Sequence, residues 1–147
     1  MAQTTATSAE GAFADRTHGQ MFSKASSPAY QAYQILRVAF VVAPVVAGLD
    51  KFFHLLVNWD MYVAPVIANL SPIGGPRLML VIGIVEIIAG IIVAVKPRIG
   101  AYVVCAWLLG IVINLLLIPG FFDIALRDFG LALGALALGR LSKEFSS

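Results

Sequence analysis

Glu86 lies in the middle of an apolar run, residues 78–95, in which every other side chain is uncharged. A charged side chain at the centre of a bilayer costs roughly 2.5–3.5 kcal/mol on insertion scales, so it needs a partner inside the protein. Ionisable residues in this setting mark head-group sites, proton relays or solute paths, and they also form ion pairs that fix helix register. The sequence leaves the functional and the structural interpretations open.

Helical geometry indicates two basic partners for this carboxylate. Glu86 lies roughly 12 Å below the outer end of its segment, while Lys51 and Arg127 each lie about 8 Å below the outer ends of theirs, at about 1.5 Å per residue. Both side chains are long enough to close this gap, whereas Arg37 lies at the opposite edge. We therefore predict a buried polar cluster or ligand site that comprises Glu86, Arg127, Lys51, Asp50, Asp128, His54 and Asn114.

Small residues beside these charges predict that they face other helices and not lipid. Gly83 and Gly90 share a helix face with Glu86, and Gly130 follows Arg127 at helical spacing. Glycines let a neighbouring backbone approach closely. We therefore expect the polar cluster in the outer half of a helical bundle.

No catalytic or metal-binding set is recognisable in the chain. The single cysteine, Cys105, lies in an apolar run and is interpreted as a small buried hydrophobe. His18 and His54 do not form a paired haem site, and there is no CxxC, phosphate loop or Ser/His/Asp set. We predict no catalytic residues and no metal site, and we place any catalytic centre on a partner protein.

Composition indicates an integral membrane protein. Of the 147 residues, 60% are hydrophobic and 12% are charged, against about 45–50% and about 25% in soluble domains. So few charges cannot cover the surface of a soluble domain of this length. The net charge of +2 is too small to indicate nucleic-acid binding, and membrane lipids are the expected surroundings.

Four apolar segments follow a polar N-terminal stretch. Each is near the roughly 20 residues that cross a bilayer core as a helix, and helices satisfy their backbone groups internally. The stretch 1–29 is rich in Ala, Ser, Thr and Gly without apolar periodicity, which predicts a disordered cytoplasmic tail. We predict an all-α fold in which 30–147 form a transmembrane four-helix bundle with spans at about 35–57, 78–95, 99–118 and 122–141.

The connection between the first two spans, about residues 57–77, has apolar residues at helical spacing, beginning with Trp59 and Tyr62. Trp and Tyr are favoured at membrane interfaces. The pattern predicts a short interfacial helix that acts either as a lid over the bundle or as a packed loop with an interfacial anchor.

Basic residues concentrate at one end of the predicted spans. Because Lys and Arg are enriched in cytoplasmic loops, we predict that both termini are cytoplasmic. The residues that define this end are Lys24, Arg37, Lys96, Arg98, Arg140 and Lys143.

Three stretches resemble the DoxX-like (DoxX/DoxD) four-helix membrane proteins: ILRVAFVVAPVVAGLDKFF, GIVEIIAGIIVAVKPRIGAYV and RDFGLALGALALGRL. The resemblance covers about residues 33–141, and it rests on the order and spacing of Arg37, Gly48-x-x-Lys51, Glu86-x-x-x-Gly90 and the basic residues that follow. The family is tied to membrane redox chemistry, and one branch is a subunit of thiosulfate:quinone oxidoreductase. The resemblance implies a bacterial-type inner (plasma) membrane location, an accessory or quinone-linked role, and other membrane or redox subunits as partners. Quinone is the one candidate cofactor that it suggests, and no cofactor is assigned from the residues.

Two classes of function remain in view. One is a non-catalytic, quinone-linked subunit of a membrane oxidoreductase or electron-transfer complex. The alternative is a small oligomeric transporter or channel, or a purely structural scaffold subunit, although no internal inverted repeat supports a transporter.

Overall fold

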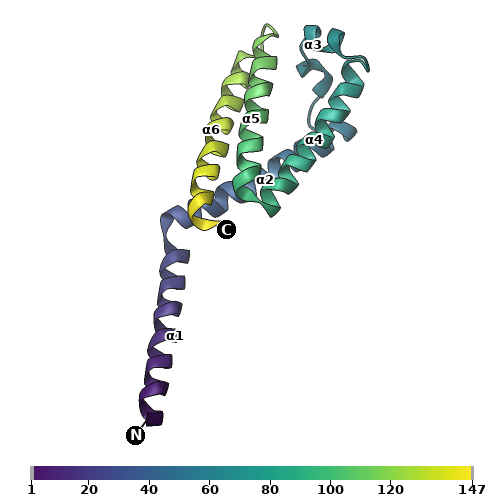
Figure 1. Cartoon of the computed structure of the whole chain (residues 1–147). Coiled ribbons are helices and arrows are strands. Elements are labelled where there is room, and N and C mark those ends of the chain that lie inside the picture. Colours follow the sequence, from purple (N-terminus) through teal and green to yellow (C-terminus); the bar gives the residue numbers. More distant parts are fainter. Residues whose placement is uncertain (1, 147) are drawn as a thin grey trace.

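The computed structural model describes residues 2–146, and all the regular structure in this range is helical (Figure 1). Three helices, α2, α4 and α5, are long and apolar enough to cross a membrane, which is consistent with a multi-pass membrane protein. The elements are α1 (Ala2–Ser26), α2 (Pro28–Phe53), the 3-10 helix η1 (Trp59–Tyr62), α3 (Pro65–Leu70), α4 (Gly75–Val95), α5 (Pro97–Leu116) and α6 (Phe122–Phe145).

The long helices begin where the sequence favours a start. Pro28 and Pro97 occupy the first turns of α2 and α5, where the missing N–H of proline is not needed for the helix. Ser27 caps α2, because its hydroxyl oxygen accepts a hydrogen bond from the Tyr30 amide at 3.2 Å. Lys96 alone separates α4 from α5, so these helices form a tight antiparallel turn.

The helices α2, α4, α5 and α6 form two pairs. The contacts are most extensive between α2 and α4 and between α5 and α6, while α4–α5 and α2–α6 contacts join the pairs. Figure 1 shows the pairs close together near the start of α5 and separating toward η1 and α3. The apolar core lies at the closed end and includes Tyr33, Phe40, Val93, Val104 and Leu138.

Five of the six residues that define the predicted basic end lie at the closed end: Arg37, Lys96, Arg98, Arg140 and Lys143. The Arg37 guanidinium donates a hydrogen bond to the carbonyl oxygen of Ala94, near the end of α4, at 2.6 Å. Figure 1 places the C-terminus and the start of α2 at this same end. Arg37 is therefore committed to the end of α4, far along the helix from Glu86.

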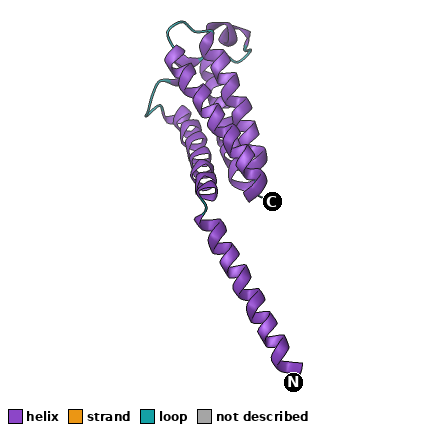
Figure 2. Ribbon diagram, turned by 90° about the vertical axis from the view of Figure 1, so that its left-hand side faces the viewer, coloured by secondary structure: helices purple, strands orange, loops and turns teal. Residues whose placement is uncertain are grey.

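The N-terminal stretch differs from the predicted disordered tail. Residues Ala2–Ser26 form α1, which projects from the other helices (Figure 2) and is exposed wherever its side chains are described. Its alanines favour helix without burial, whereas its Ser, Thr and Gly residues are weaker helix formers. The missing apolar periodicity correctly indicates an unburied segment, but helix formation does not require burial.

The connection between α2 and α4 also differs from its prediction. The helix α2 ends at Phe53 and not near residue 57, because His54 adopts a left-handed conformation with φ of 53°. One interfacial helix is predicted, yet two short ones form, η1 and α3, separated by the extended residues Val63 and Ala64.

Candidate functional site

A buried ion pair between α2 and α4 answers the question posed by Glu86. The Lys51 Nζ lies 2.5 Å from Glu86 Oε2, and the two residues are only 2% and 7% exposed. Each charge therefore has the opposite charge as a direct partner within the apolar interior. Of the two predicted partners, the structure selects the lysine.

Glycines on both helices create the space for this pair. A Cβ atom built on Gly48 would lie 2.5 Å from the carbonyl oxygen of Gly83, so α2 and α4 touch backbone to backbone. A Cβ built on Gly83 would lie 3.2 Å from Lys51 Cβ and 3.3 Å from Lys51 Cδ. The lysine stem thus runs past Gly83 toward the carboxylate one turn deeper.

Trp59 covers the ion pair on the side of the outer connection. The Lys51 Nζ lies 3.8 Å from the centroid of the Trp59 ring, a distance suited to a cation–π interaction. Asp50 orients this ring, because its Oδ2 accepts a hydrogen bond from Trp59 Nε1 at 2.7 Å. Asp50 also accepts from the amides of Leu55 and Leu56 and so holds the chain as it leaves α2. This aspartate therefore has a positioning role.

Arg127 is not the partner of Glu86, contrary to the prediction from depth. Its Nε pairs with Oδ1 of the adjacent Asp128 at 3.0 Å; the arginine side chain is 63% exposed and the aspartate side chain 8%. The reason lies in the packing, since α6 lies against α5 and, less extensively, α2. The position of a residue along its helix gives its depth in the bundle, but it does not show which helices lie next to each other.

The remaining predicted residues have different environments. His54 is exposed at the end of α2 and does not line the site. Asn114 fastens the outer connection to α5: its Nδ2 donates to the Tyr62 carbonyl at 2.5 Å, and its Oδ1 accepts from the Ala64 amide at 2.9 Å. Tyr62 also packs edge-on against Phe121, with ring centroids 5.0 Å apart.

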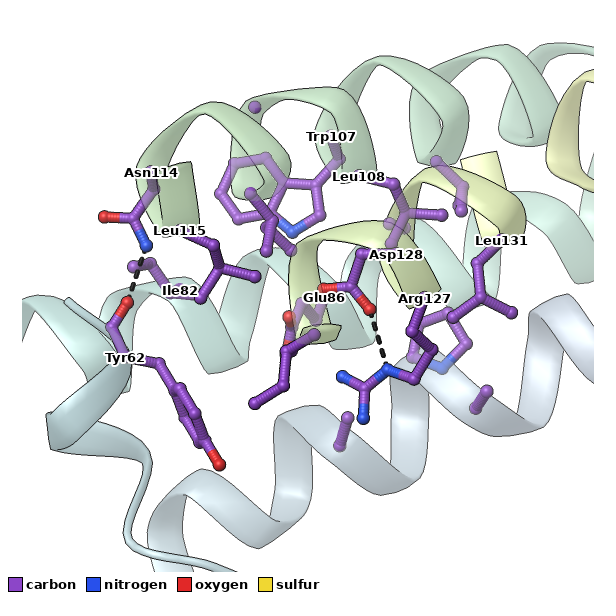
Figure 3. A pocket seen from close by; sticks show the side chains of 18 of the residues that line it. Tyr62, Ile82, Glu86, Trp107, Leu108, Asn114, Leu115, Arg127, Asp128 and Leu131 are labelled. Carbon is purple, nitrogen blue, oxygen red and sulfur yellow. Dashed lines mark hydrogen bonds and ion pairs between the residues drawn. The ribbon is translucent and has the colours of Figure 1, made fainter. Parts of the chain in front are cut away.

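A cavity of about 870 Å³ lies between the two helix pairs, beneath the connection that carries Trp59 and Tyr62. Its walls are mainly aliphatic and aromatic. Figure 3 shows side chains from α4, α5 and α6 converging on it. Its ionisable and amide lining residues are Lys51, Glu86, Asn114, Arg127 and Asp128.

Trp107, which the sequence reasoning missed, supplies a buried donor in this cavity. Its indole Nε1 makes no close hydrogen bond within the described part of the chain, and the acceptor nearest to its direction is the Glu86 carboxylate. Figure 3 shows the indole nitrogen on the cavity side of α5, facing the Glu86 carboxylate. A sequence signal existed, because Trp107 lies in the middle of an apolar segment and not at an interface, where tryptophan is usually enriched.

Within residues 2–146, no three His, Cys, Asp or Glu side chains come together as a metal site. Comparisons of the chain with protein-family models, curated proteins and solved structures find no match.

Proposed function

We propose that this protein is an accessory, quinone-linked subunit of a membrane oxidoreductase or electron-transfer complex. The observation that carries the proposal is the cavity of about 870 Å³, with apolar walls and a few convergent polar groups. Sites for small amphipathic ligands have this character. A membrane quinone matches it, since it joins carbonyl oxygens to an apolar tail.

The polar groups fit a quinone ring. The charges of Lys51 and Glu86 balance each other, as do those of Arg127 and Asp128, so the cavity suits a neutral ligand. The Trp107 N–H faces the Glu86 carboxylate without a close hydrogen bond, so it is a buried donor that an approaching carbonyl oxygen can engage. A bound quinone would supply electron-transfer chemistry, and the redox centre that exchanges electrons with it would belong to a partner subunit.

The membrane arrangement that accompanies this function is a transmembrane four-helix bundle with α6 as the fourth span. Two features support it: α6 has 24 residues, enough to cross a bilayer core, and it lies along the apolar helix α5 (Figure 1). The pairing of Arg127 with Asp128 lowers the cost of placing α6 in the membrane. We place the protein in a bacterial-type inner membrane with both termini in the cytoplasm.

Purification in mild detergent tests the proposal. We expect the protein to co-purify with redox subunits, and quinone to be extractable from the complex in a fixed ratio to the chain. A Trp107→Phe variant of the same complex should retain less quinone. A homo-oligomer free of quinone and redox subunits that conducts solute across liposomes would instead establish the transporter or channel alternative.

A further inference from the structure

The cavity reaches the surface between α2 and α6. Ala39 and Ala43 on α2, and Gly130 and Leu131 on α6, line the cavity and are also exposed. Gly110 on α5 and Leu56 after α2 are two further exposed lining residues, whereas the lining residues on α4 are buried or half-buried. Of the α4–α5 and α2–α6 contacts that join the helix pairs, the one between α2 and α6 is the less extensive, and the small residues there leave a gap on the flank of the helices.

The gap between α2 and α6 is closed at its inner end and unfilled one turn nearer the outer end. At its inner end, a Cβ built on Gly134 would lie 3.3 Å from Phe40 Cζ, so α2 and α6 meet there. At Gly130, one turn nearer the outer end, a Cβ would meet no atom within 4 Å. The gap between α2 and α6 is therefore closed at Gly134, and no atom of the described chain fills the space beside Gly130.

We propose that the ligand is a long-chain molecule with a neutral, hydrogen-bond-accepting head group, which enters sideways from the bilayer through this α2–α6 opening. Its head-group oxygen accepts the Trp107 N–H, and its apolar tail lies between Ala43 and Gly130. The inference rests on the proposed function, because it specifies the ligand class and the route of entry for the same cavity.

The head-group assignment follows from the balance of donors and acceptors. The carboxylates of Glu86 and Asp128 already pair with cations, and Trp107 Nε1, which faces Glu86 without a close hydrogen bond, is a buried donor that a ligand can engage. Tryptophan can only donate. The cavity therefore selects an acceptor oxygen, and its balanced ion pairs disfavour a head group with net charge.

Binding measurements on the purified full chain in detergent test both halves of the proposal. The probes are a benzoquinone with a decyl chain, the same ring without the chain, and decylbenzene, which lacks the oxygens. We expect the wild type to bind the decyl quinone most tightly and decylbenzene about tenfold or more weakly, the loss that corresponds to one hydrogen bond.

Two variants separate head group from tail. Trp107→Phe should weaken both quinones by about tenfold, because it removes only the donor. Gly130→Leu should weaken the decyl quinone by about tenfold and change the tail-less ring by less than about twofold, because leucine occupies the opening. Ala137→Leu is the matched control, since it lies on the same face of α6, is exposed and does not line the cavity; it should leave both affinities unchanged.

Each outcome is decisive. If the wild type binds neither quinone, the proposed function fails and the inference fails with it. If it binds both, but Gly130→Leu has no effect or weakens them equally, only the lateral route is overturned. Binding of decylbenzene as tight as that of the decyl quinone, or an unaffected Trp107→Phe variant of normal melting temperature, overturns the head-group assignment.

Discussion

At the residue scale, the Lys51–Glu86 pair makes each residue dependent on the other. Removing one member of a buried pair leaves the other charge without compensation and typically costs about 3–5 kcal/mol. We therefore expect Glu86→Gln to lower the free energy of unfolding by about this amount. Lys51→Met, combined with Glu86→Gln, should restore much of the loss, because it removes the charge and keeps the apolar stem. A double-mutant cycle of melting temperatures in detergent measures this coupling.

Arg127→Gln is the matched control for this cycle. The arginine side chain is 63% exposed and pairs with Asp128, so it should not rescue Glu86→Gln. Rescue by Arg127→Gln with none by Lys51→Met would show that α6, and not α2, supplies the partner of Glu86.

The sequence foreshadowed this pair only in part, for physical reasons. Shared helix faces and depth correctly predicted a contact between Glu86 and Lys51. Each of these residues lies three positions after a glycine that packs at the α2–α4 contact. The same reasoning wrongly chose Arg127, since depth carries no information on which helices are neighbours. The role of Asp50 as acceptor for Trp59 depends on a turn after Phe53 that periodicity does not reveal.

At the element scale, the contact between α2 and α4 depends on two glycines. A methyl group at Gly48 would lie 2.5 Å from the Gly83 carbonyl oxygen, so Gly48→Ala must push the helices apart. We expect a loss of about 1–3 kcal/mol in the free energy of unfolding, typical of overpacking, together with weaker Lys51–Glu86 pairing. Thermal unfolding of the purified variant measures the loss.

Gly110→Ala controls for helix propensity. A Cβ at this position in α5 meets nothing within 4 Å, so alanine should stabilise the protein by roughly 0.5–1 kcal/mol. A Gly48→Ala variant at least as stable as Gly110→Ala would contradict the close backbone contact between α2 and α4.

Asn114 joins two elements that are distant in sequence. It bonds both the Tyr62 carbonyl and the amide of Ala64, a residue with 0% exposure. Asn114→Leu leaves that buried amide unpaired, which costs about 1–3 kcal/mol. We expect a lower melting temperature and faster proteolysis between η1 and α3. Asn69→Leu, at an exposed position of α3, should produce neither change.

The predicted helix boundaries are correct where they depend only on residues that are neighbours in the sequence. Pro97 and the tight connection at Lys96 mark the junction of α4 and α5 in both the sequence and the structure. The end of α2 is displaced, because the Asp50 side chain bonds the amides of Leu55 and Leu56 and turns the chain early. The helix α1 was missed because it has no apolar face and because its Ser, Thr and Gly residues are weak helix formers.

At the scale of the whole molecule, the closed end and the open end of the helices consist of different kinds of residue. Aromatic and aliphatic side chains fill the closed end, where Tyr30, Tyr33 and Phe145 pack together. Glycines and charged residues lie in the open half, where no side chain of the described residues fills the space between the helix pairs and the cavity forms. This unfilled space separates the helix pairs and would also hold a ligand.

The orientation of this asymmetric molecule in the membrane is our last prediction. Arg37, Lys96 and Arg98 lie at the closed end, which predicts that this end faces the cytoplasm. In a Cys105→Ala background, a cysteine at Asn69 should react with an impermeant thiol reagent added outside intact cells, because this position is exposed and lies in α3 at the open end. A cysteine at Ser146 should react only after the membrane is permeabilised. Labelling of Ser146→Cys in intact cells would reverse the orientation and would place the cavity mouth toward the cytoplasm.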